Sequence, residues 1–118
     1  GRELAPDRAR ALRCLRIADS LERVKREIAG QEGRQPILWA TSAAAGGDCL
    51  PVRTARRRLR ASGSPLLLLL GTGWGLAPTV LAEADAVIEP ICGAADYNHL
   101  SVRCAAAILL DRLLHEEA

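Results

Sequence analysis

Leu66–Leu76, with the sequence LLLLLGTGWGL, joins a run of leucines directly to a glycine-rich turn. Five leucines after Pro65 are too few to cross a bilayer, but they suit a central parallel strand buried on both faces. Glycines at positions 71, 73 and 75 let the backbone bend sharply and approach a ligand closely. The pattern predicts an open α/β sheet that holds a small ligand at the carboxyl edge of its strands.

The composition is that of a soluble globular protein. The 118 residues are 49% hydrophobic and 25% charged, which predicts a single domain over residues 1–118. Aromatic residues make up only 3%, so stacking platforms for single-stranded nucleic acid are scarce. No segment resembles a signal peptide or reaches transmembrane length, which favours a cytoplasmic location without a membrane partner. Because the chain contains no methionine, we expect it to be a fragment or a processed product.

Four cysteines are widely spaced, at Cys14, Cys49, Cys92 and Cys104, with no C-x-x-C motif and no paired histidines. This spacing favours free buried thiols over a disulfide, and it disfavours zinc, whose ligands usually lie closer together in sequence. We therefore expect no metal.

Five arginines and no acidic residue lie between positions 53 and 60, although the net charge of the chain is only +2. On a helix these side chains spread around most of the circumference, so at least three would face solvent together. Such a surface is able to contact phosphates, and the alternative is a solvated helix that keeps the protein soluble.

Strand and helix patterns alternate along the chain. Asp7 is a candidate N-cap for a short helix through Leu12, Asp19-Ser20 supplies a second N-cap, and Gly30 sits where a C-terminal glycine cap belongs. The order βαβαβαβα predicts a mostly parallel sheet covered on both faces. The expected strands are 14–18, 37–41, 66–70 and 86–91, and the expected helices are 21–29, 51–61, 77–84 and 99–115.

Two loops, Gly71–Leu76 and Ile91–Arg103, follow strands and would open at the same sheet edge. The first is not a dinucleotide fingerprint, because its glycines do not have the G-x-G-x-x-G spacing, and this disfavours a nicotinamide oxidoreductase. It is not a P-loop either, since the required Lys and Ser/Thr are missing.

The residues of these loops resemble the bacterial RNA methyltransferases of the SPOUT superfamily, which use S-adenosylmethionine. The resemblance rests on Gly71–Pro78, on Glu89-Pro90, on Asp96–Arg103 and on the helix that ends with Leu109–Leu114. Asp19–Glu22 extends it over most of the chain, and the last fifty residues are its most specific part.

This resemblance implies an α/β fold with a deep C-terminal trefoil knot, a bound S-adenosylmethionine, a homodimer that completes the site, and tRNA or rRNA as substrate. It also implies three walls for the cofactor site. Mapped by motif, the walls are Gly71, Thr72, Gly73 and Gly75; Glu89, Pro90, Ile91 and Gly93; and Asn98, Leu100 and Ser101.

Methyl transfer from a sulfonium needs a positioned nucleophile and an acceptor for its proton. His99 and Asp96 are candidate acceptors, and Arg103 is a candidate for holding a phosphate or orienting a base. Asn98 and Ser101 either orient cofactor and target or satisfy free amides at the start of the last helix. Structural roles are also open for His99, Asp96 and Arg103. Tyr97 either packs on the sheet or stacks on a nucleobase.

The chain also departs from the family pattern. SPOUT enzymes generally carry a further polar motif, often with a catalytic arginine, nearer the N-terminus, so we expect that an N-terminal part is missing here. Cys92, Ala94-Ala95 and Cys104 are smaller departures. The alternative function is a non-catalytic dimerisation or RNA-binding module derived from the same fold.

Overall fold

The computed structural model describes residues 5–42, 48–72, 74–91 and 100–116. These residues form an α/β fold in which, after two helices, strands and helices alternate. The elements, in chain order, are α1 (Pro6–Arg13), α2 (Leu21–Glu32), β1 (Ile37–Thr41), α3 (Val52–Ser62), β2 (Leu66–Leu69), α4 (Pro78–Glu83), β3 (Ala86–Ile88) and α5 (Val102–Leu114).

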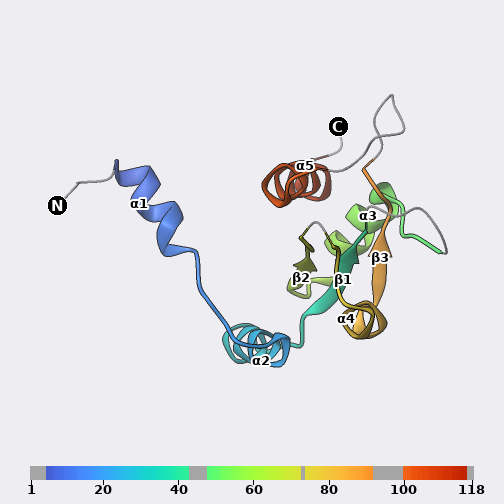
Figure 1. Cartoon of the computed structure of the whole chain (residues 1–118), viewed down its shortest axis with the longest axis horizontal. Coiled ribbons are helices and arrows are strands. Elements are labelled where there is room, and N and C mark those ends of the chain that lie inside the picture. The colour runs from blue at the N-terminus through green and yellow to red at the C-terminus, as the bar shows by residue number, and fades with distance from the viewer. Residues whose placement is uncertain (1–4, 43–47, 73, 92–99, 117–118) are drawn as a thin grey trace.

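The sheet is parallel, with the strand order β2-β1-β3 (Figure 1). The parallel prediction is confirmed, but the place predicted for the leucine strand is wrong. β1 is the central strand, whereas β2 lies at an edge and its four leucines are only half-buried. The apolar run specified a strand, and the two crossovers decided which strand lies in the middle.

Both faces of β1 are covered, as predicted. Trp39 packs with α3 and α5 in the main core, while Leu38 and Ala40, which point to the opposite face, are 3% and 0% exposed. The connections explain this arrangement. The crossover through α3 runs from β1 to β2 and that through α4 runs back to β3, so right-handed connections place the two helices on opposite faces.

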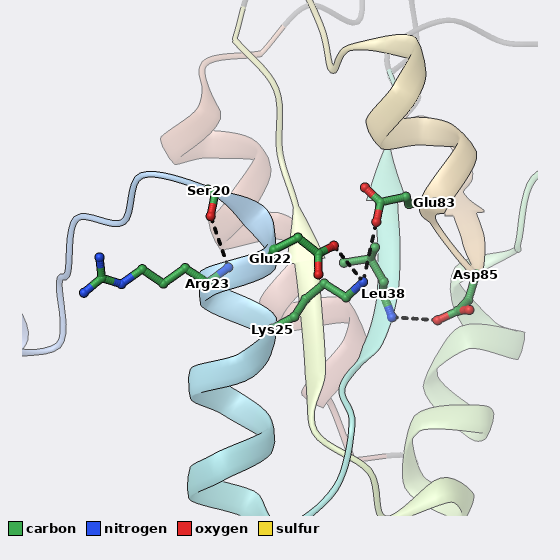
Figure 2. A network of polar contacts seen from close by, with 7 residues as sticks. All are labelled: Ser20, Glu22, Arg23, Lys25, Leu38, Glu83 and Asp85. Atoms are coloured by element: carbon green, nitrogen blue, oxygen red, sulfur yellow. Dashed lines mark hydrogen bonds and ion pairs between the residues drawn. The ribbon is translucent and has the colours of Figure 1, made fainter.

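A polar network ties α2 and α4 to the sheet (Figure 2). Lys25 of α2 pairs with Glu22 on its own helix and with Glu83 of α4, at 3.5 Å each. Next along the chain, Asp85 accepts a hydrogen bond from the Leu38 amide at 2.9 Å and donates its own amide to the Leu38 carbonyl at 2.7 Å. These bonds hold the start of β3 against β1.

The strand predicted at 14–18 is absent. These residues link α1 to α2 without strand pairing, and Leu15 and Ile17 are 72% and 102% exposed. Alternating apolar residues form a strand only when they pair with another strand, and this segment lies outside the described sheet. The predicted order βαβαβαβα therefore loses its first strand.

The helix caps correct three of the predicted boundaries. Ser20 caps α2 as expected, since its hydroxyl accepts from the Arg23 amide at 3.2 Å. The glycine that ends α2 is Gly33, in the left-handed conformation, rather than Gly30. Asp7 lies in the first turn of α1, whose N-cap position belongs to Ala5. α5 begins at Val102, later than the predicted start of 99.

Figure 1 shows α1 standing apart from the rest of the molecule, and none of its residues is buried. The radius of gyration is 15.6 Å, whereas a compact chain of this length would have about 13.5 Å. The protruding N-terminal helix accounts for the difference.

Three of the cysteines lie in the described part of the chain, and none of the three forms a disulfide. The prediction that they are buried is wrong, because Cys14 and Cys104 are exposed and Cys49 is only half-buried. Over the same residues, no group of His, Cys, Asp or Glu is arranged to hold a metal ion. None of the helices in these ranges is long and apolar enough to cross a membrane.

Candidate functional site at the carboxyl edge of the sheet

Two of the predicted site segments lie at the same edge of the sheet. β2 and β3 both pair in parallel with β1, so their carboxyl ends point the same way. Thr72 follows β2 and Ile91 follows β3, and the two segments therefore flank the end of β1. Thr41, the last residue of β1, donates its hydroxyl to the Leu69 carbonyl at 2.8 Å and joins two strand ends there.

The segment after β2 is a tight turn. The Gly75 amide donates to the Thr72 carbonyl at 2.8 Å, and these two residues form an isolated antiparallel bridge. A Cβ on Gly71 would lie 2.5 Å from the carbonyl carbon of Gly75, so this position admits only glycine. Gly75 has φ +79° and nothing within 4 Å of its Cβ position, which leaves space beside the backbone.

The segment after β3 is tied to α3 through Glu89. One carboxylate oxygen of Glu89 accepts from the Val52 amide at 2.8 Å, at the start of α3. Pro51 occupies the N-cap position of α3 and has no side chain able to cap, so Glu89 satisfies this free amide in its place. Ile91 packs against the main core, and Pro90 is half-buried beside it.

α5 lies on α3 and runs in the same direction. Arg56 donates to the Arg112 carbonyl and Arg60 to the His115 carbonyl, both at 2.6 Å, so the contacts advance together along the two helices. Since α3 begins at the carboxyl edge, the N-terminus of α5 points to that edge as well. Val102 shares a helix face with buried Leu109 but is 42% exposed, as expected where the helix extends past the core.

The first turn of α5 carries two of the candidate site residues. The Ser101 hydroxyl accepts from the Cys104 amide at 3.2 Å, which makes Ser101 the N-cap and removes that role from Asn98. Arg103 is exposed, and Leu100 is 44% exposed rather than part of an apolar helix face.

The structure thus brings one set of predicted residues to the carboxyl edge and leaves another outside the residues it describes. Those placed at or toward the edge are Gly71, Thr72, Gly75, Glu89, Pro90, Ile91, Leu100, Ser101 and Arg103. Those outside the described residues are Gly73, Gly93, Asp96, Tyr97, Asn98 and His99.

The five arginines of α3 divide into two groups. Arg56 and Arg60 bind the last carbonyls of α5, where cationic side chains complement the helix dipole. Arg53, Arg57 and Arg58 are exposed, and so is Arg60 despite its bond to α5. The prediction that at least three of these arginines face solvent is therefore confirmed.

Sequence reasoning missed three features of this edge. It did not assign the Thr41 hydroxyl that joins two strand ends, the capping role of Glu89, or the full exposure of Trp74. One signal was present, because a proline directly before a helix requires a capping group from elsewhere in the chain.

The fold is that of an α/β domain with a parallel sheet, and in open sheets of this kind ligands bind at the carboxyl edge of the strands. The model of a family described as SAM-dependent RNA methyltransferase matches residues 1–115. The chain therefore belongs to the SAM-dependent RNA methyltransferase family.

Three relatives illustrate the similarity. The chain is 46% identical over 109 residues to a tRNA (guanine-N(1)-)-methyltransferase of Oleidesulfovibrio alaskensis and 44% identical over 109 residues to one of Nitratidesulfovibrio vulgaris. These matches cover 92% of the chain but 25% of each relative. It is also 37% identical to an uncharacterized protein of Aquifex aeolicus, with 96% of the chain and 55% of the relative covered. The chain thus spans between a quarter and about half of these proteins.

Proposed function

We propose that this chain is the cofactor-binding domain of a methyltransferase that acts on tRNA or rRNA, with S-adenosylmethionine held between the segments after β2 and β3. The observation that supports this most strongly is their geometry. Two backbone-rich segments follow parallel strands on either side of β1 and open at one sheet edge.

The residues of the edge suit this cofactor. The turn at Gly71, Thr72 and Gly75 offers backbone groups, with nothing beyond its chain neighbours within 4 Å of the Cβ position of Gly75, and an adenine edge can be satisfied by backbone donors and acceptors. Because the Glu89 carboxylate already caps α3, we assign its cofactor contact, and those of Pro90 and Ile91, to the backbone. The remaining proposed cofactor residues are Gly73, Gly93, Asn98 and Leu100.

The bound cofactor would supply an electrophilic methyl group on a sulfonium. The chain's own part is to orient the nucleophile and take its proton. We assign orientation to Asn98 and Ser101, proton acceptance to His99 with Asp96 as the alternative, and a phosphate contact to Arg103. The support from the structure is that α5 carries Ser101 and Arg103 toward the carboxyl edge.

We further propose that the active form is a homodimer joined through α5, in the SPOUT manner with a knotted C-terminal segment. Support comes from Leu110 and Leu114, which lie one turn apart on α5 and are 51% and 65% exposed. Leu110→Asp should convert a dimer to monomer in sedimentation velocity, and Asp111→Lys on the same helix serves as the control. If the unaltered chain itself sediments as a monomer, the proposed dimer is refuted.

Calorimetric titration with S-adenosylmethionine tests the cofactor site. The unaltered chain should bind, Gly75→Val should not, and Gly30→Ala, far along α2, should bind normally. Transfer of a labelled methyl group to bulk tRNA or rRNA then tests the activity. A folded chain that binds no cofactor would refute the proposal, whereas cofactor-independent RNA binding without transfer would favour the non-catalytic module.

The exposed arginines of α3 provide a second test. If Arg53, Arg57 and Arg58 contact phosphates, RNA affinity should fall with salt, and each Arg→Ala change should reduce the slope of log K against log salt by roughly 0.7–0.9. Arg8→Ala on the protruding helix α1 is the matched control. Equal slopes for all variants would exclude the arginine helix from the RNA interface.

A further inference from the structure

Trp74 exposes its whole side chain. Its exposed fraction is 100%, whereas the chain's other tryptophan, Trp39, is 3% exposed in the core. An indole that remains in water contributes no burial to folding, although burying one removes roughly 150–250 Å² of surface from water. Trp74 is therefore available to a binding partner.

The turn that carries Trp74 is braced on both sides. The bridge between Thr72 and Gly75 encloses it, and the close approach of Gly71 to Gly75 leaves no room for the turn to accept a side chain there. The preceding strand end is held by the bond from Thr41 to the Leu69 carbonyl. Such a short bridged turn lowers the entropy cost of ordering the backbone that carries the indole when a partner binds.

The sheet edge that carries Trp74 favours an anionic partner with flat, apolar faces. The turn follows β2 at the carboxyl edge, and α3 begins at the same edge on the other side of β1, next to β3, with exposed Arg53 and, one turn later, exposed Arg57. Nucleobases stack on aromatic side chains, and the phosphates between them pair with arginine. An apolar protein surface would fit the indole but would not require the exposed arginines at the same sheet edge.

We propose that Trp74 is a stacking platform for an unpaired nucleobase of the RNA substrate, whose phosphates contact the start of α3 at the same sheet edge. This inference rests on the proposed RNA methyltransferase function and adds a recognition residue to it. It predicts that the domain prefers RNA with a single-stranded loop over fully paired RNA, because only an unstacked base can lie on the indole.

The test compares a labelled hairpin RNA with a fully paired duplex of the same length in fluorescence anisotropy. Trp74→Ala should weaken hairpin binding by about tenfold, since each stacked base contributes ~1–3 kcal/mol by alanine substitution. Trp74→Phe should retain most of the affinity because the ring remains. Duplex affinity, S-adenosylmethionine affinity and the sedimentation coefficient should not change.

Ile17→Ala is the matched control, since Ile17 is 102% exposed but lies on the segment between α1 and α2. It should leave hairpin affinity within about twofold of the unaltered value. Tryptophan fluorescence gives a direct readout. Hairpin RNA should quench emission in the unaltered chain but not in Trp74→Phe, where only buried Trp39 remains.

Hairpin binding that is indifferent to Trp74→Ala would overturn the stacking site while leaving the RNA function intact. Loss of self-association or of cofactor affinity in Trp74→Ala, with hairpin affinity retained, would overturn it in favour of a second copy of the chain or of the cofactor. If the unaltered chain bound no RNA, the proposed function and the stacking site would fall together.

Discussion

Gly71 shows how one residue type determines the geometry of the candidate site. Its missing Cβ allows the backbone of Gly75 to approach within van der Waals distance, and the turn after β2 depends on that approach. Gly30, in contrast, lies inside α2 with nothing within 4 Å of its Cβ position. The same substitution should therefore have opposite effects at the two positions.

We expect Gly71→Ala to destabilise the chain by about 1–3 kcal/mol through overpacking and to abolish S-adenosylmethionine binding. Gly30→Ala should stabilise it by about 0.5–1 kcal/mol, because alanine is the better helix former. Urea unfolding monitored by circular dichroism measures both. A Gly71→Ala variant as stable as the unaltered chain would show that the turn has another conformation.

Glu89 has a structural role that its motif did not predict. Because its carboxylate caps α3, Glu89→Ala should cost about 1 kcal/mol of folding free energy, while Glu89→Gln should retain much of the cap. Glu32→Ala, an exposed carboxylate at the end of α2, should change stability by less than about 0.5 kcal/mol. Equal effects of Glu89→Ala and Glu32→Ala in urea unfolding would contradict the cap.

At the scale of elements, α3 holds α5 in place through two of its arginines. Arg56→Ala leaves the Arg112 carbonyl at the end of α5 without its cationic donor, and we expect a loss of about 1.5 kcal/mol. Arg58→Ala should change the free energy of unfolding by less than about 0.5 kcal/mol. Thermal unfolding of the two variants checks this, and similar midpoints would argue against the docking role.

The link between α2 and α4 should depend on pH. Glu22 and then Glu83 raise the pKa of Lys25 above its ordinary value of 10.5. Stability from a raised lysine pKa is fully present below the unfolded-state value and is lost as pH rises through the folded-state value. The difference in unfolding midpoint between the unaltered chain and Lys25→Met should thus be constant from neutral pH upward and shrink above pH 10.5. A difference that persists in strong alkali would contradict the pairing.

The elements also show how far sequence patterns reach. Continuous apolar runs predicted β1 and β2, and the Ser20 cap predicted the start of α2, because these signals are local. The place of β2 in the sheet, the absence of a strand at 14–18 and the start of α5 depend on which segments pair and pack across the fold. The common edge of the 71–76 and 89–91 segments was predictable from parallel order, but the Glu89 cap was not.

At the scale of the whole molecule, the N-terminal helix α1 should be cleaved by a protease sooner than the sheet and the helices packed on it. No residue of α1 is buried, and the following segment to α2 is exposed. Trypsin should therefore cut after Arg13 or Arg16 well before it reaches the arginines of α3, which is packed against the core. Mass spectrometry of a time course identifies the first products. Cleavage within residues 52–62 before cleavage at Arg13 or Arg16 would contradict this prediction, because it would show that α3 unfolds readily from the core.

β2 has a strand partner on one side only within the described sheet, and its four residues are all leucine. Along its other side, backbone donors and acceptors run beside an apolar surface, with no charged residue or proline inside the strand to discourage pairing. Such an edge is a template for pairing with a strand of another molecule. Further polypeptide or self-assembly that pairs with β2 would remove this route to aggregation.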